Sequence, residues 1–181
     1  NAETGKPLNT LPTPWGTGED IAAYGSLIAT REMGNRWQAS EGPEVIYNAA
    51  TGYYYLFMAY DALEVPYNTR VCRSQNIYGP YLGIDGTNRG EMLPIVTHPY
   101  KFNNSHGWVG IAHCAVFDDG NGNWYYASQG RFPENVGGNT YSNALMMGHV
   151  RSIRWNSQGW PVVMPERYGA VPQIAITEDE L

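Results

Sequence analysis

The amino-acid sequence predicts an all-β chain that forms part of a β-propeller. Short apolar and aromatic segments alternate with turns rich in Gly, Pro, Asn and Asp, and a unit of four such segments occurs twice. Helical signals are weak, since the segment 19–28 would make at most a turn or two. A β-sandwich with accidental internal similarity is the alternative that this pattern leaves open.

The first unit extends over residues 43–84. We expect its strands at Pro43–Tyr47, Tyr53–Tyr60, Thr69–Ser74 and Tyr81–Ile84. The segment 48–52 forms the first turn, and Gly-Pro and Asp-Gly pairs flank the last strand. The Tyr-rich second segment is apolar on both faces, which is typical of a buried middle strand.

The second unit repeats this order over residues 113–164. We expect its strands at His113–Phe117, Trp124–Ser128, Leu145–Trp155 and Trp160–Met164. Thr51-Gly-Tyr-Tyr-Tyr aligns with Gly122-Asn-Trp-Tyr-Tyr, at an offset of roughly 70 residues. Four antiparallel strands with Gly and aromatic punctuation are the pattern of a propeller blade.

The start of the chain resembles the last hairpin of the second unit, because the segment 1–8 matches 155–162. We therefore expect about two blades plus the last strand of a preceding one. A propeller needs about four to eight blades to protect its strand edges, so this chain is expected to be part of a larger domain. Residues 1–165 are assigned to the propeller, and 166–181 to an exit segment or the start of a further domain.

Composition argues against several classes of function. The 181 residues carry a formal net charge of −6, and no basic run exists that would bind a nucleic-acid backbone. No stretch of about 18 apolar residues predicts a membrane-spanning helix. Cys72 and Cys114 each lie in an apolar strand, so we expect buried thiols, with a disulfide as the alternative.

Glu41 is the candidate catalytic residue, in Ser40-Glu41-Gly42-Pro43 ahead of an apolar strand. The inner strand of a blade lines the central channel, where ligands bind. Aromatic neighbours such as Trp37 and Tyr47 would desolvate the carboxyl group and favour its protonated form, as a general acid requires. A solvated loop glutamate is the alternative.

Two further residues are candidates for ligand binding. His113 begins the matching strand of the second unit, so it is expected to face the channel axis; a structural core histidine is the alternative. Arg70 and Arg73 lie on one strand, and we expect them to share one face. Arg70 would bind hydroxyls or hold a carboxylate, with an ion pair inside the sheet as the alternative.

An ordered series of motifs resembles the second half of glycoside hydrolase family 43, and its arabinanases in particular. The series is Ser40–Pro43, Gly52–Asp61, Tyr67–Ser74 and Ile77–Tyr81. The segment around His113 is similar to the family's glycine-histidine segment, and 155–161 to its tryptophan-aspartate-glycine-tryptophan-proline ending. Two positions depart from the family's pattern: Cys72 replaces a glycine, and 110–112 replace glycine-proline-glycine.

The resemblance implies a five-bladed propeller and glycoside hydrolysis with inversion. It makes Glu41 the general acid and His113 a ligand of one metal ion, commonly calcium, with waters completing the shell. Trp37 or Tyr60 would stack on a furanose ring, and Arg70 would bind substrate. No organic cofactor is expected.

Inverting hydrolysis needs a second carboxyl group about 6.5–9.5 Å from the first. The family's two aspartates precede the region covered here, and no residue of this chain matches them. Four aspartates of the chain lie in turns or at strand ends: Asp61, Asp85, Asp118 and Asp119. We therefore expect the N-terminal half of the propeller to come from a second chain or a precursor. The chain alone is expected to be inactive.

The resemblance implies that the substrate is arabinan, the α-1,5-linked L-arabinofuranose polymer of plant cell walls, or its oligosaccharides. Such a polymer is met outside the cytoplasm, so a secreted, periplasmic or cell-surface location is expected. The alternatives are an α-L-arabinofuranosidase or β-xylosidase of the same family, and a non-catalytic carbohydrate-binding propeller. A protein-interaction propeller predicts no carboxyl group at the channel, and Glu41 counts against it.

Overall fold

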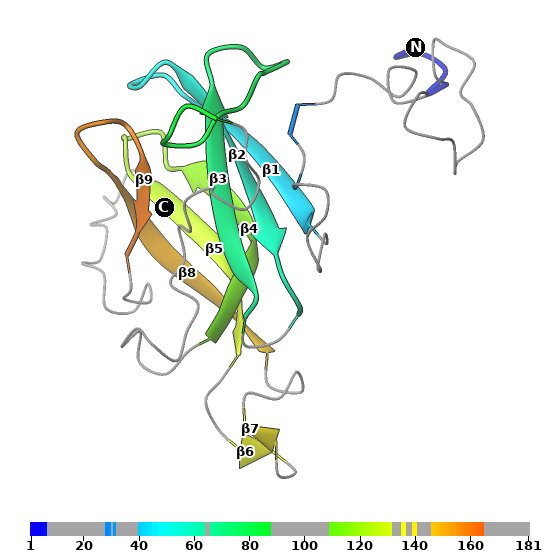
Figure 1. Ribbon diagram of the computed structural model, residues 1–181, viewed down its shortest axis with the longest axis vertical. Helices are drawn as coiled ribbons and strands as arrows, with labels where there is room; N and C mark the ends of the chain where they lie inside the picture. The colour runs from blue at the N-terminus through cyan, green and yellow to red at the C-terminus, as the bar shows by residue number, and fades with distance from the viewer. Residues whose placement is uncertain are drawn as a thin grey trace, which may run out of the picture.

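The computed structural model describes residues 1–6, 28–29, 31, 40–63, 66–87, 109–131, 135–136, 139–140 and 146–164. The regular structure in these residues is β-strand, arranged in two antiparallel sheets and a separate two-stranded hairpin (Figure 1). The all-β prediction is confirmed for this part of the chain. The helical turn expected at 19–28 falls, except for its last residue, outside the described residues.

The first sheet has the order β1-β2-β3, with β1 at Ser40–Asn48, β2 at Tyr53–Tyr60 and β3 at Asn68–Ser74. The predicted fourth strand is reduced to one bridge between Leu82 and Arg73. The chain turns immediately afterwards, because the Gly83 N–H donates to the Thr87 carbonyl at 2.8 Å. A strand cannot continue through that turn, so the prediction for 81–84 is wrong beyond a single residue.

The second sheet has the order β4-β5-β8-β9 (Figure 1). Its strands are β4 at Val109–Asp118, β5 at Trp124–Arg131, β8 at Met146–Trp155 and β9 at Pro161–Val163. Between β5 and β8 the chain forms a short hairpin that was not predicted, from β6 at Asn135–Val136 and β7 at Asn139–Thr140. Consecutive antiparallel strands in spatial order are the topology of a propeller blade.

The two sheets pack against each other, and β4 contacts all three strands of the first sheet. The core between them is apolar and aromatic: Tyr55, Phe57, Val71, Ile111, Cys114, Val116, Tyr126, Ile153, Trp160 and Val163. A hydrogen bond also crosses it, since the hydroxyls of Thr69 and Tyr126 lie 2.7 Å apart. Cys72 and Cys114 are free and buried, as predicted.

The internal repeat is confirmed at the level of topology. β2 and β5, which carry the aligned Tyr-rich and Trp-Tyr-Tyr segments, are each the second strand of their sheet. The order β1-β2-β3 of the first sheet matches β4-β5-β8 of the second, as expected for successive blades, while the number of blades stays a prediction. The segment 1–6 forms a turn in which the Gly5 N–H donates to Asn1, much as the Gly159 N–H donates to Asn156 in the β8–β9 turn. The strands expected beside it fall outside the described residues.

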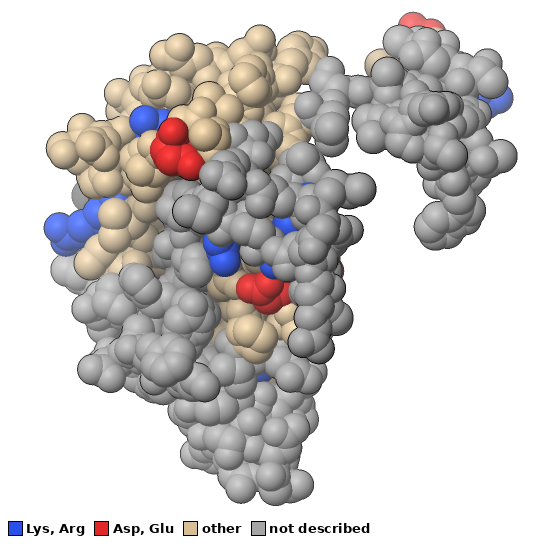
Figure 2. Space-filling view, viewed as in Figure 1, with Lys and Arg blue, Asp and Glu red and all other residues tan. Residues whose placement is uncertain are grey.

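Among the described residues on the face shown in Figure 2, acidic and basic side chains lie close to one another. Within the described part of the chain, no helix is long and apolar enough to cross a membrane.

Candidate active site

The first feature of the site is a β-bulge at the start of β1. Glu41 pairs with Ala59 and Glu44 pairs with Phe57, so β1 has one residue more than β2 between these pairs. Gly42 lies in the bulge at a φ of +56°. A bulge bends its strand and re-aims the neighbouring side chains. The exposed Glu41 side chain is therefore placed by an irregular part of β1 and not by the regular pleat.

The matching strand β4 is irregular at the same level. Its pairing with β5 shifts on both sides of Ala112, and His113 has a φ of +58°. A non-glycine residue in this region is uncommon, and such strain gathers at functional sites. A Cβ atom added to Gly42 would lie 3.0 Å from Cδ2 of His113. The imidazole thus packs directly over Gly42, which explains why a glycine follows Glu41.

Tyr67, at the end of the β2–β3 loop, joins these two residues. Its hydroxyl donates a hydrogen bond to Oε1 of Glu41 at 2.6 Å and lies 3.4 Å from Nδ1 of His113. Burial, then the hydrogen bond to Glu41 and its charge, raise the pKa of Tyr67 far above its ordinary value, while Arg131 opposes this. The hydroxyl therefore keeps its proton and acts as the donor.

Arg131 lies beneath this group and is completely buried. Its Nη2 donates to the Leu63 carbonyl at 2.6 Å, and its Nη1 lies 3.5 Å from the Gly110 carbonyl. Leu63 belongs to the loop that carries Tyr67, and Gly110 belongs to the part of β4 that leads to His113. Arg131 therefore contacts both the loop that carries Tyr67 and the part of β4 that leads to His113.

Sequence reasoning did not assign a role to Tyr67 or Arg131. The motif Tyr67–Ser74 contained the tyrosine, but nothing distinguishes it among the 14 tyrosines of the chain. Its partner Glu41 is 26 residues away, so the contact depends on how the β2–β3 loop folds back. For Arg131 the sequence contains one weak signal. A guanidinium group buried at the end of an apolar strand needs hydrogen-bond acceptors close to it.

Tyr60 and Arg70 lie elsewhere. Tyr60 is fully buried, with the guanidinium groups of Arg31 and Arg70 at 4.4 and 5.3 Å from its ring centre. This burial leaves no ring face on which a sugar could stack. Arg70 is half-buried and its Nε donates to Asn68 at 3.1 Å, so a role in substrate binding stays a prediction.

Arg70 and Arg73 point to opposite faces of the first sheet, so the expectation of a shared face is wrong. Residues three apart on a strand alternate, and only an even spacing places two side chains on one face. Arg70 contacts Tyr60, which packs in the cluster of Leu56 and Cys72. Arg73 instead contacts Trp160 of the core between the sheets.

The aromatic neighbours expected around Glu41 are not found there. Tyr47 is 51% exposed and packs on Tyr54, with ring centres 4.7 Å apart, at the far end of β1. It lies six positions along the strand from Glu41, about 20 Å at roughly 3.3 Å per residue. The prediction that Tyr47 desolvates Glu41 is therefore wrong, and Trp37 lies outside the described residues.

The aspartates singled out from the sequence have local structural partners. Asp61 pairs with Arg31 at 2.7 Å and accepts a hydrogen bond from Asn68. Asp85 caps its own turn through Thr87, and Asp118 and Asp119 bind backbone N–H groups of the β4–β5 turn: Gly120, Asn121 and Asn123. These contacts give each of the four a structural partner, and the expectation that none of them is the general base stays a prediction.

The implied calcium ion has one candidate ligand here. Because Nδ1 of His113 faces Tyr67, Nε2 is the nitrogen that remains for a metal. Among the residues that the structure describes, no three His, Cys, Asp or Glu side chains gather to hold a metal ion. Calcium prefers six to eight oxygen ligands, so these side chains alone do not fit it. The calcium site stays a prediction.

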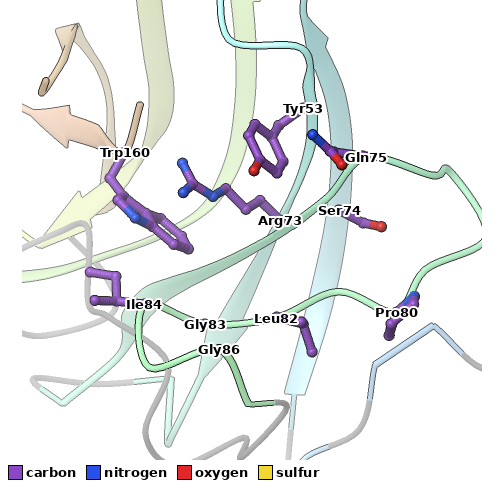
Figure 3. A pocket seen from close by; sticks show the side chains of 10 residues that line it. All are labelled: Tyr53, Arg73, Ser74, Gln75, Pro80, Leu82, Gly83, Ile84, Gly86 and Trp160. Carbon is purple, nitrogen blue, oxygen red and sulfur yellow. The ribbon is translucent and has the colours of Figure 1, made fainter. Parts of the chain in front are cut away.

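A cavity of about 330 Å³ lies at the other end of the strands, lined by the ends of β2 and β3, the segment 75–86 and Trp160 of the β8–β9 turn (Figure 3). Arg73 lies between Tyr53 and Trp160, with both ring centres 4.2 Å from its guanidinium carbon. Its Nη1 also donates to the Gln158 carbonyl at 2.7 Å. These contacts connect the two sheets, so Arg73 has a structural role there.

Comparison with known proteins assigns this chain to a family. Residues 19–161 match the model of the glycosyl hydrolases family 43. The chain belongs to this family. This confirms the family resemblance that the ordered motifs indicated. The fold of the chain is that of the family's propellers.

Two curated relatives of this family-43 chain carry enzyme names. An extracellular endo-α-(1→5)-L-arabinanase 2 of Bacillus subtilis is 30% identical over 159 residues, covering 75% of this chain and 32% of the relative. An extracellular endo-α-(1→5)-L-arabinanase of Thermotoga petrophila is 28% identical over 178 residues, covering 87% and 36%. The chain thus spans about a third of the length of either relative.

Solved structures show the same similarity. A glycoside hydrolase family 43 protein of Bacillus licheniformis superposes with a TM-score of 0.67 at 30% identity, covering 87% of this chain and 37% of that one. The endo-1,5-α-L-arabinanase of Thermotoga petrophila in complex with TRIS gives a TM-score of 0.66 at 25% identity, covering 88% and 37%.

Proposed function

We propose that this family-43 chain supplies the general acid of a secreted hydrolase that cleaves arabinan with inversion. The observation that carries the proposal is the exposed carboxyl group of Glu41, held at 2.6 Å by Tyr67 beside His113. The names of the two curated relatives support arabinan as the substrate and the outside of the cell as the location.

The geometry gives the two oxygens of Glu41 different tasks. Oε1 accepts the hydrogen bond from Tyr67, so the proton of the acid form belongs on Oε2. As the glycosidic bond breaks, Oε2 donates this proton to the leaving oxygen. An inverting mechanism then needs a carboxylate on the opposite face of the sugar to activate a water molecule.

We further propose that this base is an aspartate outside the present chain, in the N-terminal part of the same propeller. The structural partners of the four aspartates named above support this. The two curated relatives, of which the chain matches only about a third, also have room for such a residue. His113 is proposed as the one protein ligand of a hydrated calcium ion, and no step of the reaction is derived through that ion.

The test is Glu41→Gln in the protein that carries this chain together with its remaining propeller, assayed on α-1,5-arabino-oligosaccharides. Removing the acid is expected to lower kcat by about 10²- to 10⁴-fold with little change in substrate affinity. Glu44→Gln, three residues along the same strand, is the control and should keep wild-type kcat. Proton NMR of the first product formed should show the anomer opposite to that of the substrate.

Wild-type turnover in Glu41→Gln would remove Glu41 from the acid role. If the wild-type protein binds oligosaccharide but does not cleave it, the non-catalytic carbohydrate-binding propeller is the better assignment. If it releases only terminal arabinose, or xylose from xylosides, the arabinofuranosidase or β-xylosidase alternative holds.

A further inference from the structure

The hydroxyl of Tyr67 lies between the acid candidate and the histidine from the neighbouring sheet. Glu41 comes from β1, His113 from β4 and Tyr67 from the loop between β2 and β3. The tyrosine side chain is 0% exposed, although the carboxyl group that it binds faces solvent. A buried donor therefore holds one oxygen of an exposed side chain.

We propose that Tyr67 is a positioning residue for the acid step. It fixes Glu41 through Oε1 and thereby aims Oε2 and its proton at the leaving glycosidic oxygen. The inference rests on the proposed function of Glu41 as general acid.

The direction of the hydrogen bonds supports this role. A tyrosine hydroxyl has one proton, and at 2.6 Å that proton is given to Oε1 of Glu41. At its contact of 3.4 Å with Nδ1 of His113 the phenol oxygen can then act only as an acceptor, which favours the Nδ1–H tautomer. The short bond from Tyr67 restrains the rotamer of Glu41.

The support behind Tyr67 makes the positioning specific. Arg131 binds the carbonyl of Leu63 in the same loop, and the ring of Tyr67 packs with Ala59 and Ala112. Ala59 is the residue paired with Glu41 across the bulge. The donor is thus fixed relative to the backbone that carries the acid, which is the condition for aiming a proton.

The test compares leaving groups in the full protein. The substrates are aryl glycosides of α-1,5-arabinotriose whose phenols range from phenol to 2,4-dinitrophenol. A good leaving group needs no proton from the acid, so a defect in acid catalysis disappears as the phenol becomes more acidic. For Tyr67→Phe we expect kcat to fall about 10- to 100-fold on the phenyl glycoside and on arabino-oligosaccharides, with KM little changed. On the dinitrophenyl glycoside we expect less than about a threefold loss.

Tyr81→Phe is the matched control. Tyr81 is also 0% exposed, and its hydroxyl donates at 3.2 Å to the Ile77 carbonyl, away from Glu41. This variant loses a comparable hydrogen bond and should show no dependence on the leaving group. A uniform loss across all phenols in Tyr67→Phe, like that of a merely destabilised protein, would overturn the proposal.

Glu41→Gln in the same assay separates the two proposals. If it shows the leaving-group dependence and Tyr67→Phe does not, Glu41 is the acid and the inference about Tyr67 is wrong. If Glu41→Gln shows none, the proposed function itself fails. If Tyr67→Phe does not fold, proton NMR of the wild-type protein tests the inference instead. The Tyr67 hydroxyl proton should give a downfield NMR resonance that disappears in Glu41→Ala, and its absence from the wild type refutes the inference.

Discussion

Gly42 offers the sharpest test of how the site is built, through the substitution Gly42→Ala. The added methyl group would lie 3.0 Å from Cδ2 and 3.2 Å from Cγ of His113, which is tighter than ordinary van der Waals contact. The backbone at a φ of +56° also disfavours any side chain. The substitution therefore combines a backbone cost with a displacement of the imidazole.

The two effects can be separated with Gly52→Ala. Gly52 has a φ of +73°, but nothing lies within 4 Å of a Cβ atom there. A left-handed residue other than glycine costs about 1–2 kcal/mol, and this is the loss of unfolding free energy expected for Gly52→Ala. Gly42→Ala should lose a similar amount, because the exposed His113 ring can rotate away by the few tenths of an ångström needed. That rotation moves Nδ1 away from Tyr67.

The assays are urea unfolding for stability and kcat/KM on arabino-oligosaccharides for function. We expect the two variants to differ by less than about 1 kcal/mol in stability, while only Gly42→Ala loses activity, by about tenfold or more. Wild-type activity in Gly42→Ala would refute the argument that the site depends on the packing of His113 over Gly42. An equal activity loss in Gly52→Ala would show that the effect is one of general stability.

Arg73→Ala removes a cation–π contact with Tyr53 of its own sheet and, toward the second sheet, the contact with Trp160 and the hydrogen bond to Gln158. The free energy of unfolding measured in urea should therefore fall by about 2–3 kcal/mol, while kcat should be unchanged. Arg154→Ala, at an exposed position of β8, should change it by less than about 0.5 kcal/mol, and equal losses would contradict the role of Arg73. Burial raises the pKa of both Cys72 and Cys114 to about 12, so both are protonated thiols at pH 8. Iodoacetamide should label neither in the native protein and both after denaturation, and rapid native labelling would show that they are not buried.

Much of the fold could be predicted because it depends on local chemistry. The apolar segment of β2 was located to the residue, since two turns bound it and its burial on both faces leaves an uninterrupted apolar run. The strand expected at 81–84 failed for the opposite reason. Its residues Tyr81 and Leu82 look strand-like, but the backbone bonds of the following turn compete with the sheet.

The candidate site could also be predicted only in part from the sequence. Glu41 and His113 were found from motifs, and the structure brings them together through Gly42 and Tyr67. Tyr60 was expected, as an alternative to Trp37, to stack on a furanose ring, yet it is fully buried under two arginines and the core. Aromatic residue type does not reveal exposure, because exposure is decided by contacts between segments far apart in the sequence.

The errors in the strand limits point to the site itself. The strands were expected to begin at residues 43 and 113, where regular alternation begins, but β1 begins at Ser40 and β4 at Val109. Residues 40–42 and 109–112 therefore belong to the strands although they were not predicted to. Bulges interrupt the pairing in both places, and Gly42, Gly110 and His113 have a positive φ. An alternating pattern cannot pass through such residues, so a sequence reading stops there. Glu41 and His113 lie at these irregular positions, and both side chains approach the hydroxyl of Tyr67. In both β1 and β4, the positions where regular strand pairing is interrupted are therefore those that carry the candidate site residues.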